Sequence, residues 1–193
     1  MKRILIFLLM ISAVLIFGGC SNKNVDTDNK EEVKKFDDLT MTRSIGTFSN
    51  LWIDLPSWRE ENSENCITIS NQNYYIITVI SEEDYTFDEL YNNEIKVNLS
   101  QFVDRGTYSD FAPNKDEVIL SNGINAVKFD SNLSMDSYGT LYEYPAYGYY
   151  FKYENYPIMV MFVDIDTTNN EEKRNDIKKY VDEMVQTIRH LSL

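Results

Sequence analysis

The hydrophobic pattern divides the chain into three parts. An almost continuous apolar run covers Ile4–Phe17, polar residues follow to about residue 40, and strand-like and helix-like spacings then alternate to the C-terminus. The apolar run is shorter than the ~20 residues that a membrane-spanning helix needs. The pattern predicts a leader over residues 1–19, a solvated tether over 20–40 and a single folded domain over 41–193.

Alternation of apolar and polar residues predicts a series of strands within that domain. The Asn122-Gly123 pair lies between two apolar runs and predicts a hairpin whose two turn residues both have positive φ. Residues 100–115 are mixed in character and are expected to form a loop. The predicted strands are Phe48–Leu55, Ile67–Ile69, Tyr74–Ile80, Glu117–Ser121, Ile124–Asp130, Tyr138–Tyr144, Tyr147–Tyr153 and Ile158–Ile165.

Two segments have the spacing of helices. Thr86 and Glu89 form a capping box that opens a predicted helix over Phe87–Leu99. In Glu171–Leu191 the apolar residues recur every three or four positions, which predicts an amphipathic helix that ends near His190. Because the strands come in hairpin-linked runs, we expect an α+β fold in which an antiparallel β-sheet is packed on one face by two helices.

The leader has the features of an export signal. It begins with Lys2 and Arg3 and ends in Gly18-Gly19-Cys20, which resembles the bacterial lipobox, although Phe17 stands where that motif usually has Leu. The resemblance implies a lipoprotein signal peptide over 1–19 and lipidation of the Cys20 thiol. The chain would then be lipid-anchored at the extracytoplasmic face of a bacterial cell membrane. An ordinary secretory signal or an uncleaved anchor is the alternative.

The net charge of the chain limits the classes of partner that it can bind. Cleavage before Cys20 would remove Lys2 and Arg3 and no acid, so 16 basic residues would face 31 acidic ones and the net charge would be −15. Such a chain repels nucleic acid and anionic headgroups. We therefore expect no nucleic-acid partner, attachment to the membrane through the lipid anchor, and an unknown envelope protein or glycan as ligand.

Catalytic motifs are absent from the sequence. It contains no nucleophile elbow, zinc-protease motif or phosphate-binding loop. Cys66 lies in a predicted strand, where a buried and inert thiol is expected. We expect no enzyme activity, no cofactor and no metal, with a small envelope hydrolase that uses carboxylates as the alternative. Asp164–Glu171 resembles the opening of a calcium loop, but Asn169 replaces the turn glycine and Asn175 the final Glu, so a strand end and a helix cap are expected.

Aromatic density is the one candidate for recognition. Tyr147, Tyr149, Phe151 and Tyr153 alternate along one predicted strand and share a face. Such residues favour core packing in sheets, which is the interpretation we prefer. An exposed row of tyrosines could instead stack on a sugar or seat a peptide, so Tyr147, Tyr149 and Tyr153 are the ligand-binding candidates.

The order of these segments resembles the PsbP-like fold family, which includes a photosystem II subunit, a nuclear-import factor and bacterial lipoproteins. The resemblance covers about Thr47–Leu191 and implies a binding or assembly module without conserved chemistry and without a particular ligand. It is carried by Leu55-Pro56-Ser57-Trp58, Thr86-Phe87-Asp88-Glu89-Leu90, Asn122-Gly123-Ile124-Asn125-Ala126 and Val181 with Val185-Gln186-Thr187-Ile188.

Overall fold

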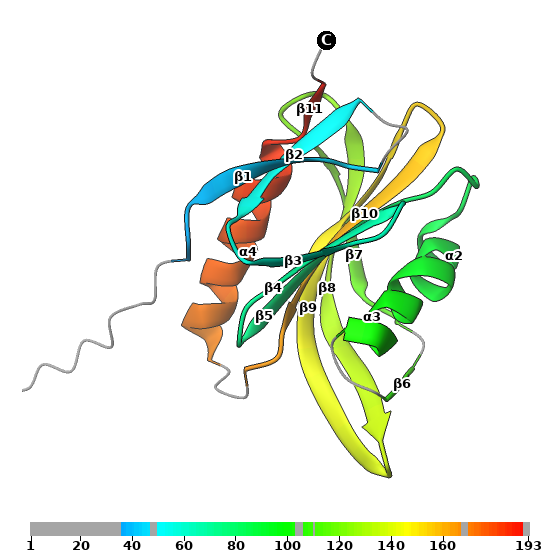
Figure 1. The fold of residues 1–193 in the computed structure, drawn as a ribbon, viewed down its shortest axis with the longest axis vertical. Helices are drawn as coiled ribbons and strands as arrows, with labels where there is room; N and C mark the ends of the chain where they lie inside the picture. Colours follow the sequence, from blue (N-terminus) through cyan, green and yellow to red (C-terminus); the bar gives the residue numbers. More distant parts are fainter. Residues whose placement is uncertain (1–35, 47–49, 103–105, 110, 167–169, 191–193) are drawn as a thin grey trace, which may run out of the picture. The chain divides into compact units, whose positions relative to one another are not determined.

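The fold is an antiparallel sheet with helices on both faces. The computed structural model describes residues 36–46, 50–102, 106–109, 111–166 and 170–190. The main sheet has the strand order β3-β4-β5-β10-β9-β8-β6, and β7 also pairs with β8. A small second sheet has the order β1-β2-β11. This arrangement confirms the predicted α+β class (Figure 1).

The strands are β1 (Leu39–Ser44), β2 (Leu51–Pro56), β3 (Arg59–Asn62), β4 (Cys66–Ser70), β5 (Tyr74–Ile80), β6 (Thr107–Tyr108), β7 (Asn114–Ile119), β8 (Asn125–Ser137), β9 (Thr140–Tyr153), β10 (Tyr156–Asp164) and β11 (Arg189–His190). The first helical segment runs through α2 (Phe87–Leu90), the π-helical turn η1 (Tyr91–Ile95) and α3 (Lys96–Phe102). The closing helix is α4 (Glu171–Gln186).

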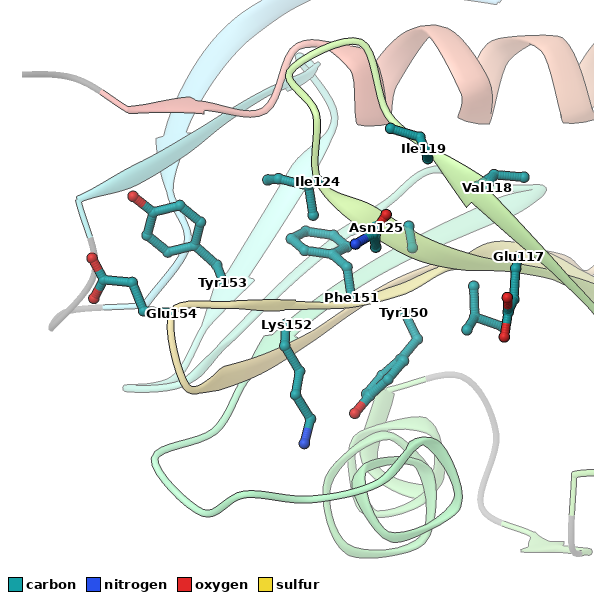
Figure 2. A pocket seen from close by; sticks show the side chains of 12 residues that line it. Glu117, Val118, Ile119, Ile124, Asn125, Tyr150, Phe151, Lys152, Tyr153 and Glu154 are labelled. Atoms are coloured by element: carbon teal, nitrogen blue, oxygen red, sulfur yellow. The ribbon is translucent and has the colours of Figure 1, made fainter.

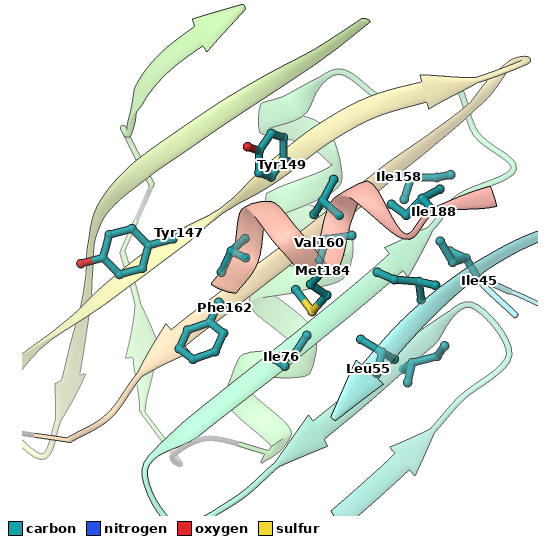
Figure 3. Packing of buried hydrophobic residues seen from close by; sticks show 14 of the residues in the cluster. Ile45, Leu55, Ile76, Tyr147, Tyr149, Ile158, Val160, Phe162, Met184 and Ile188 are labelled. Atoms are coloured by element: carbon teal, nitrogen blue, oxygen red, sulfur yellow. The ribbon is translucent and has the colours of Figure 1, made fainter. Parts of the chain in front are cut away.

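Two cores lie on opposite faces of the main sheet. Helix α4 covers one face, where Met184 and Ile188 pack with Val160 and Phe162 (Figure 3). The α2-η1-α3 segment covers the other face, where Leu90 and Ile95 belong to the second core. The strands therefore bury both of their faces, as a sheet between two helical layers requires, and the prediction that the helices pack on one face was wrong.

The first helix begins where its capping box predicts. The Thr86 side chain accepts from the Glu89 backbone N–H, and the Glu89 carboxylate accepts from the Thr86 backbone N–H at 2.8 Å. These bonds satisfy backbone donors that the first helical turn leaves without partners. The π-helical turn that follows was not foreseen, and the helix continues to Phe102.

The closing helix is shorter than predicted. It ends at Gln186 with Thr187 as its C-cap, and the chain then forms β11, which pairs with β2. The Arg189 guanidinium binds both oxygens of Asp54 at 2.8 and 2.9 Å. This bidentate pair and the strand pairing replace the last helical turns, so the prediction that His190 ends a helix was wrong.

The two turns around β8 also differ from prediction. In the Leu120–Ile124 turn only Gly123 has positive φ (84°), and its N–H donates to the Leu120 carbonyl, so the turn carries one left-handed residue rather than two. The two-residue turn with positive φ at both positions lies at Tyr138-Gly139, with φ of 53° and 84°. A strand was predicted to begin at Tyr138, but β8 and β9 form one long hairpin around it.

The folded part begins before residue 41. The Phe36 ring stacks on Tyr180 of α4 with centroids 4.7 Å apart, and β1 starts at Leu39. The predicted tether therefore ends several residues earlier than expected, because these apolar residues have a core to join. The predicted signal peptide and Cys20 lie outside the described residues.

Candidate functional site

The alternating aromatic residues of β9 do share one face. Tyr147, Tyr149 and Phe151 belong to the core beneath α4, and Tyr153 packs against that core from its edge. The rings of Tyr147 and Tyr149 are only 5% and 4% exposed. They pack in the same core as the buried side chains of α4, so core packing describes these two tyrosines and no open aromatic row exists on this part of β9.

A small polar depression of about 220 Å³ lies where Tyr147 and Tyr149 meet α4. The Tyr149 hydroxyl donates to Asp182 Oδ1 at 2.7 Å, and the Lys128 ammonium donates to the same carboxylate. Next to it, Lys178 of α4 pairs with Asp130 of β8. The depression is therefore lined by ion pairs that link the helix to the sheet.

The charged groups of this depression pair with one another, as they do in a structural contact between a helix and a sheet. Burial raises the pKa of Tyr147 to about 12 and also raises the pKa of Tyr149, whose hydrogen bond to Asp182 acts in the same direction. The hydrogen bond from Lys178 lowers the pKa of Asp130. Each lysine has its own carboxylate, so these charges satisfy one another and are not arranged around a space that needs a ligand.

The third candidate, Tyr153, lines a larger hollow. This hollow of about 960 Å³ lies between the C-terminal end of β9 and the β7–β8 hairpin (Figure 2). Pairing of β8 with β9 begins at Ala126 and Phe151, whereas β9 continues to Tyr153 beside β10 alone. The two strands therefore separate at this point.

The separation has a structural cause at the hairpin turn. The Ser121 backbone N–H donates to the Gln186 side chain at 2.8 Å, and Asn122 donates to the Ile188 carbonyl at 3.0 Å. These bonds hold the turn against the end of α4. Meanwhile Tyr153 and Tyr156 close the tight turn into β10. The turn end of the hairpin, beyond the last β8–β9 pair, therefore diverges from the end of β9, and the gap between them is the hollow.

The hollow has apolar walls and charged rims. Phe151 is buried at its base, Tyr150 and Lys152 point toward α2, and Ile119 is 73% exposed beside it (Figure 2). Lys152 pairs with Asp84. Glu117 and Glu154 are the two carboxylates of the lining, and neither makes an ion pair with another described residue. The arrangement can hold an apolar group by shape and a positive charge at its edge.

Sequence reasoning found Tyr153 but missed the hollow. Ile119 and Lys152 occupy ordinary strand positions, and their alternation with polar neighbours signals only a sheet. The hollow depends on where two distant strands part, which no local pattern encodes. The Asn122-Gly123 pair was the one available signal, because it located the hairpin that forms one wall.

A thiol and two carboxyl groups among the described residues also have raised pKa values, and the two carboxyl groups lie apart from each other. Burial raises the pKa of the Cys66 thiol to about 11. Burial also raises the pKa of Glu94 and of Asp164, but Glu94 lies in η1 and Asp164 pairs with Lys173 of α4, on the opposite face of the sheet. These two carboxyl groups therefore cannot act as a pair.

The segment that resembles a calcium loop contains its own cation. The Lys173 ammonium lies 2.8 Å from Asp164 and 3.3 Å from Asp166. Asn170 caps α4 by accepting from the Lys173 backbone N–H, and Glu171 and Glu172 follow in the first turn. The expected strand end and helix cap are confirmed.

Among the described residues, no helix is both long and apolar enough to cross a bilayer. No three His, Cys, Asp or Glu side chains in the same ranges converge as the ligands of a metal ion would.

Comparison with known proteins gives distant structural likenesses alone. No model of a protein family matches the chain, and no curated protein matches it. A cyanobacterial PsbP from Synechocystis is similar in structure, with 10% identity and a TM-score of 0.46, over 78% of this chain and 92% of that one. A Pseudomonas aeruginosa protein of unknown function is similar at 11% identity and a TM-score of 0.36, over 74% and 92% of the two chains.

A third similar structure belongs to a Bacteroides thetaiotaomicron protein, at 12% identity and a TM-score of 0.40 over 74% of this chain. The matched part spans 45% of that protein. With TM-scores below 0.5, these likenesses carry no argument about what this chain does.

Proposed function

We propose that the chain is a lipid-anchored extracytoplasmic lipoprotein whose domain acts as a non-enzymatic binding or accessory module. The predicted leader over residues 1–19, which directly precedes Cys20, supports the lipid anchor. The hollow beside Tyr153 supports binding, because it exposes apolar side chains such as Ile119 that the fold itself does not cover. Its ligand would be an envelope protein or a glycan.

The geometry favours binding over catalysis. The lining of the hollow offers no cysteine, histidine or serine as a nucleophile, and its lysine is paired with Asp84. Its two carboxylates are both exposed: Glu117 lies within β7, and Glu154 lies in the turn between β9 and β10. Two exposed carboxylates on separate segments are not the enclosed acid–base pair that a hydrolase uses.

Mass spectrometry of the membrane fraction tests the anchor. We expect the mature chain to begin at a diacylated Cys20, and the Cys20→Ser variant to lose both the lipid and the membrane association. The Cys66→Ala variant is the matched control and should keep both. An unmodified Cys20, or a chain that still begins at Met1, would contradict the proposal.

Methyl NMR of isoleucine-labelled protein tests binding at the hollow. Ile119 and Ile124 line it, whereas Ile177 is a buried residue of α4 outside the hollow and reports on indirect effects. Peptidoglycan fragments and a lysine–valine peptide are the two probes. Shifts confined to Ile119 and Ile124 would support binding, and the absence of shifts with both probes would contradict it. Cleavage of either probe during the titration would instead favour a hydrolase.

A further inference from the structure

The tip of the β8–β9 hairpin carries apolar side chains that the fold leaves in solvent. Among the side chains that the structure describes, five large hydrophobic ones are exposed, and three of these lie at this tip. Tyr138 is 99% exposed, Leu141 67% and Tyr142 43%. This clustering sets the tip apart, because scattered exposed apolar residues are ordinary on protein surfaces whereas a contiguous group is not.

The backbone at the tip is also unusual for its sequence. Tyr138 has φ of 53° in the first position of a two-residue turn, where Asn, Asp or Gly is favoured. A tyrosine there is disfavoured by backbone sterics, and its exposed ring gains nothing from burial. Since neither local conformation nor core packing explains the residue, its side chain is better explained by a contact outside this chain.

The hairpin holds its tip in a fixed shape. The Gly139 N–H donates to Asp136 Oδ1 at 2.8 Å, and the Tyr142 and Tyr144 rings stack with centroids 6.3 Å apart. Behind the tip, Met135 and Leu133 are fully buried in the second core. A rigid aromatic anchor loses little conformational entropy on binding, which is typical of residues that dominate interfaces.

The apolar groups lie on both faces of the tip and at its apex. Tyr142 pairs with the buried Met135 and shares its face, whereas Leu141 pairs with Asp136 on the other face. Tyr138 is in the turn itself. A flat surface could cover one of these faces, and only a concave surface covers all three side chains.

Charge identifies the kind of surface. The tip carries Asp136 and Glu143, and no Lys or Arg occurs between Lys128 and Lys152. A second copy of this chain, with a net charge of −13, would repel the tip, and so would anionic headgroups. We propose that the tip, residues 136–143, inserts into an apolar pocket with a Lys- or Arg-rich rim on another protein. The proposal depends neither on the lipid anchor nor on the hollow.

Site-specific photo-crosslinking of the full chain in its own cells tests this contact. A benzophenone amino acid replaces Leu141, and in a second strain it replaces Val97, which is 48% exposed on α3 and serves as the control. We expect a protein adduct from position 141 and none from position 97. The crosslinked partner peptide, identified by mass spectrometry, should combine apolar residues with Lys or Arg.

A second substitution shows whether Tyr138 anchors the contact. Asn tolerates positive φ, so Tyr138→Asn should fold with an unchanged or higher melting temperature. It should reduce the yield of the adduct from position 141 at least about tenfold, the loss expected for an interface anchor. Tyr138→Phe keeps the ring and should preserve the yield.

The other outcomes would overturn the proposal. They are an adduct with lipid, an adduct with a second copy of the chain, no adduct at position 141, an equal adduct at position 97, and a partner peptide that is acidic. A protein adduct that is insensitive to Tyr138→Asn would overturn it as well.

Discussion

The Lys173 ammonium lies 2.8 Å from Oδ2 and 3.0 Å from Oδ1 of Asp164, whose side chain is completely buried. Asp164 ends β10 and Lys173 is in the first turn of α4, so this ion pair joins the central sheet to the helix that covers it. Lys173 also lies 5.3 Å from the centroid of the Tyr74 ring. The pair fixes where α4 begins on the sheet.

Removing the lysine should destabilise the fold strongly. Lys173→Met leaves the buried Asp164 carboxylate without its counter-ion, which typically costs about 3 kcal/mol or more of unfolding free energy. Lys178→Met on the same helix is the matched control. The side chains of Lys178 and its partner Asp130 in β8 are both more than a third exposed, so the loss of this pair should cost less than about 1 kcal/mol. Urea unfolding measures both. Equal losses would contradict this account of the pair.

Calcium should leave the stability of the wild-type domain unchanged. Lys173 already lies between the carboxylates of Asp164 and Asp166, which are the oxygen ligands that a cation would need. We expect the melting temperature to move by less than about 1 °C in millimolar calcium, relative to the same concentration of magnesium. A rise of several degrees specific to calcium would mean that the ion displaces the lysine.

Acid should destabilise the fold through two ion pairs that involve strands of the small sheet. The hydrogen bond from Arg43 lowers the pKa of Glu60, and that from Arg189 lowers the pKa of Asp54. The unfolded chain therefore binds these protons at a higher pH than the folded chain does. The stabilisation is complete above the ordinary carboxyl pKa values and is lost as the pH falls through the lower folded values.

We expect the unfolding free energy to fall between about pH 5 and pH 3, and to fall less steeply in Glu60→Gln. Asp164 contributes with the opposite sign because burial raises its pKa, but the comparison of variant with wild type cancels it. Glu61→Gln is the control on the same strand, since its partner Arg59 is largely exposed. Identical slopes for wild type and Glu60→Gln would count against the role of the Arg43 pair.

Gly148 should tolerate no side chain. A Cβ at this position would overlap the Val160 carbonyl oxygen and lie 2.6 Å from the Phe129 ring. Gly148→Ala should therefore cost about 3 kcal/mol of unfolding free energy through overpacking. Gly123→Ala gives the comparison, because its Cβ would meet nothing within 4 Å and only the positive φ is penalised, by about 1 kcal/mol. Thermal and urea unfolding should rank the two variants in this order.

Local patterns predicted most of the elements because their causes are local. The Thr86–Glu89 capping box placed the start of the first helix, since both hydrogen bonds lie within four residues. The alternation from Tyr147 to Tyr153 correctly placed these side chains on one face. The closing helix was predicted too long because Ile188 continues the apolar spacing of the helix. In the structure Ile188 is a core residue that follows the end of the helix.

The candidate site was predicted only in part, because it depends on contacts between segments that are distant in sequence. Tyr153 was identified by its alternation, but whether an aromatic face is open or covered depends on a helix that follows it in sequence. Tyr138 was placed in a strand because its β-propensity is high, whereas the pairing of Ser137 with Thr140 forces it into a left-handed turn. Its exposure and strain became visible only when the register of β8 and β9 was known.

The sequence by itself determined the central strands, the two helical segments, the antiparallel class of the sheet and the acidic net charge, because each follows from side-chain periodicity, turn chemistry or charge over short distances. It did not predict β1, β3, β6 or β11, which are short or lie at sheet edges. Only the tertiary structure decided that α4 covers Tyr147 and Tyr149, that the β7–β8 hairpin parts from β9, and that an apolar tip extends into solvent. These features depend on contacts between segments far apart in the chain, and packing and register, rather than local propensity, fix such contacts.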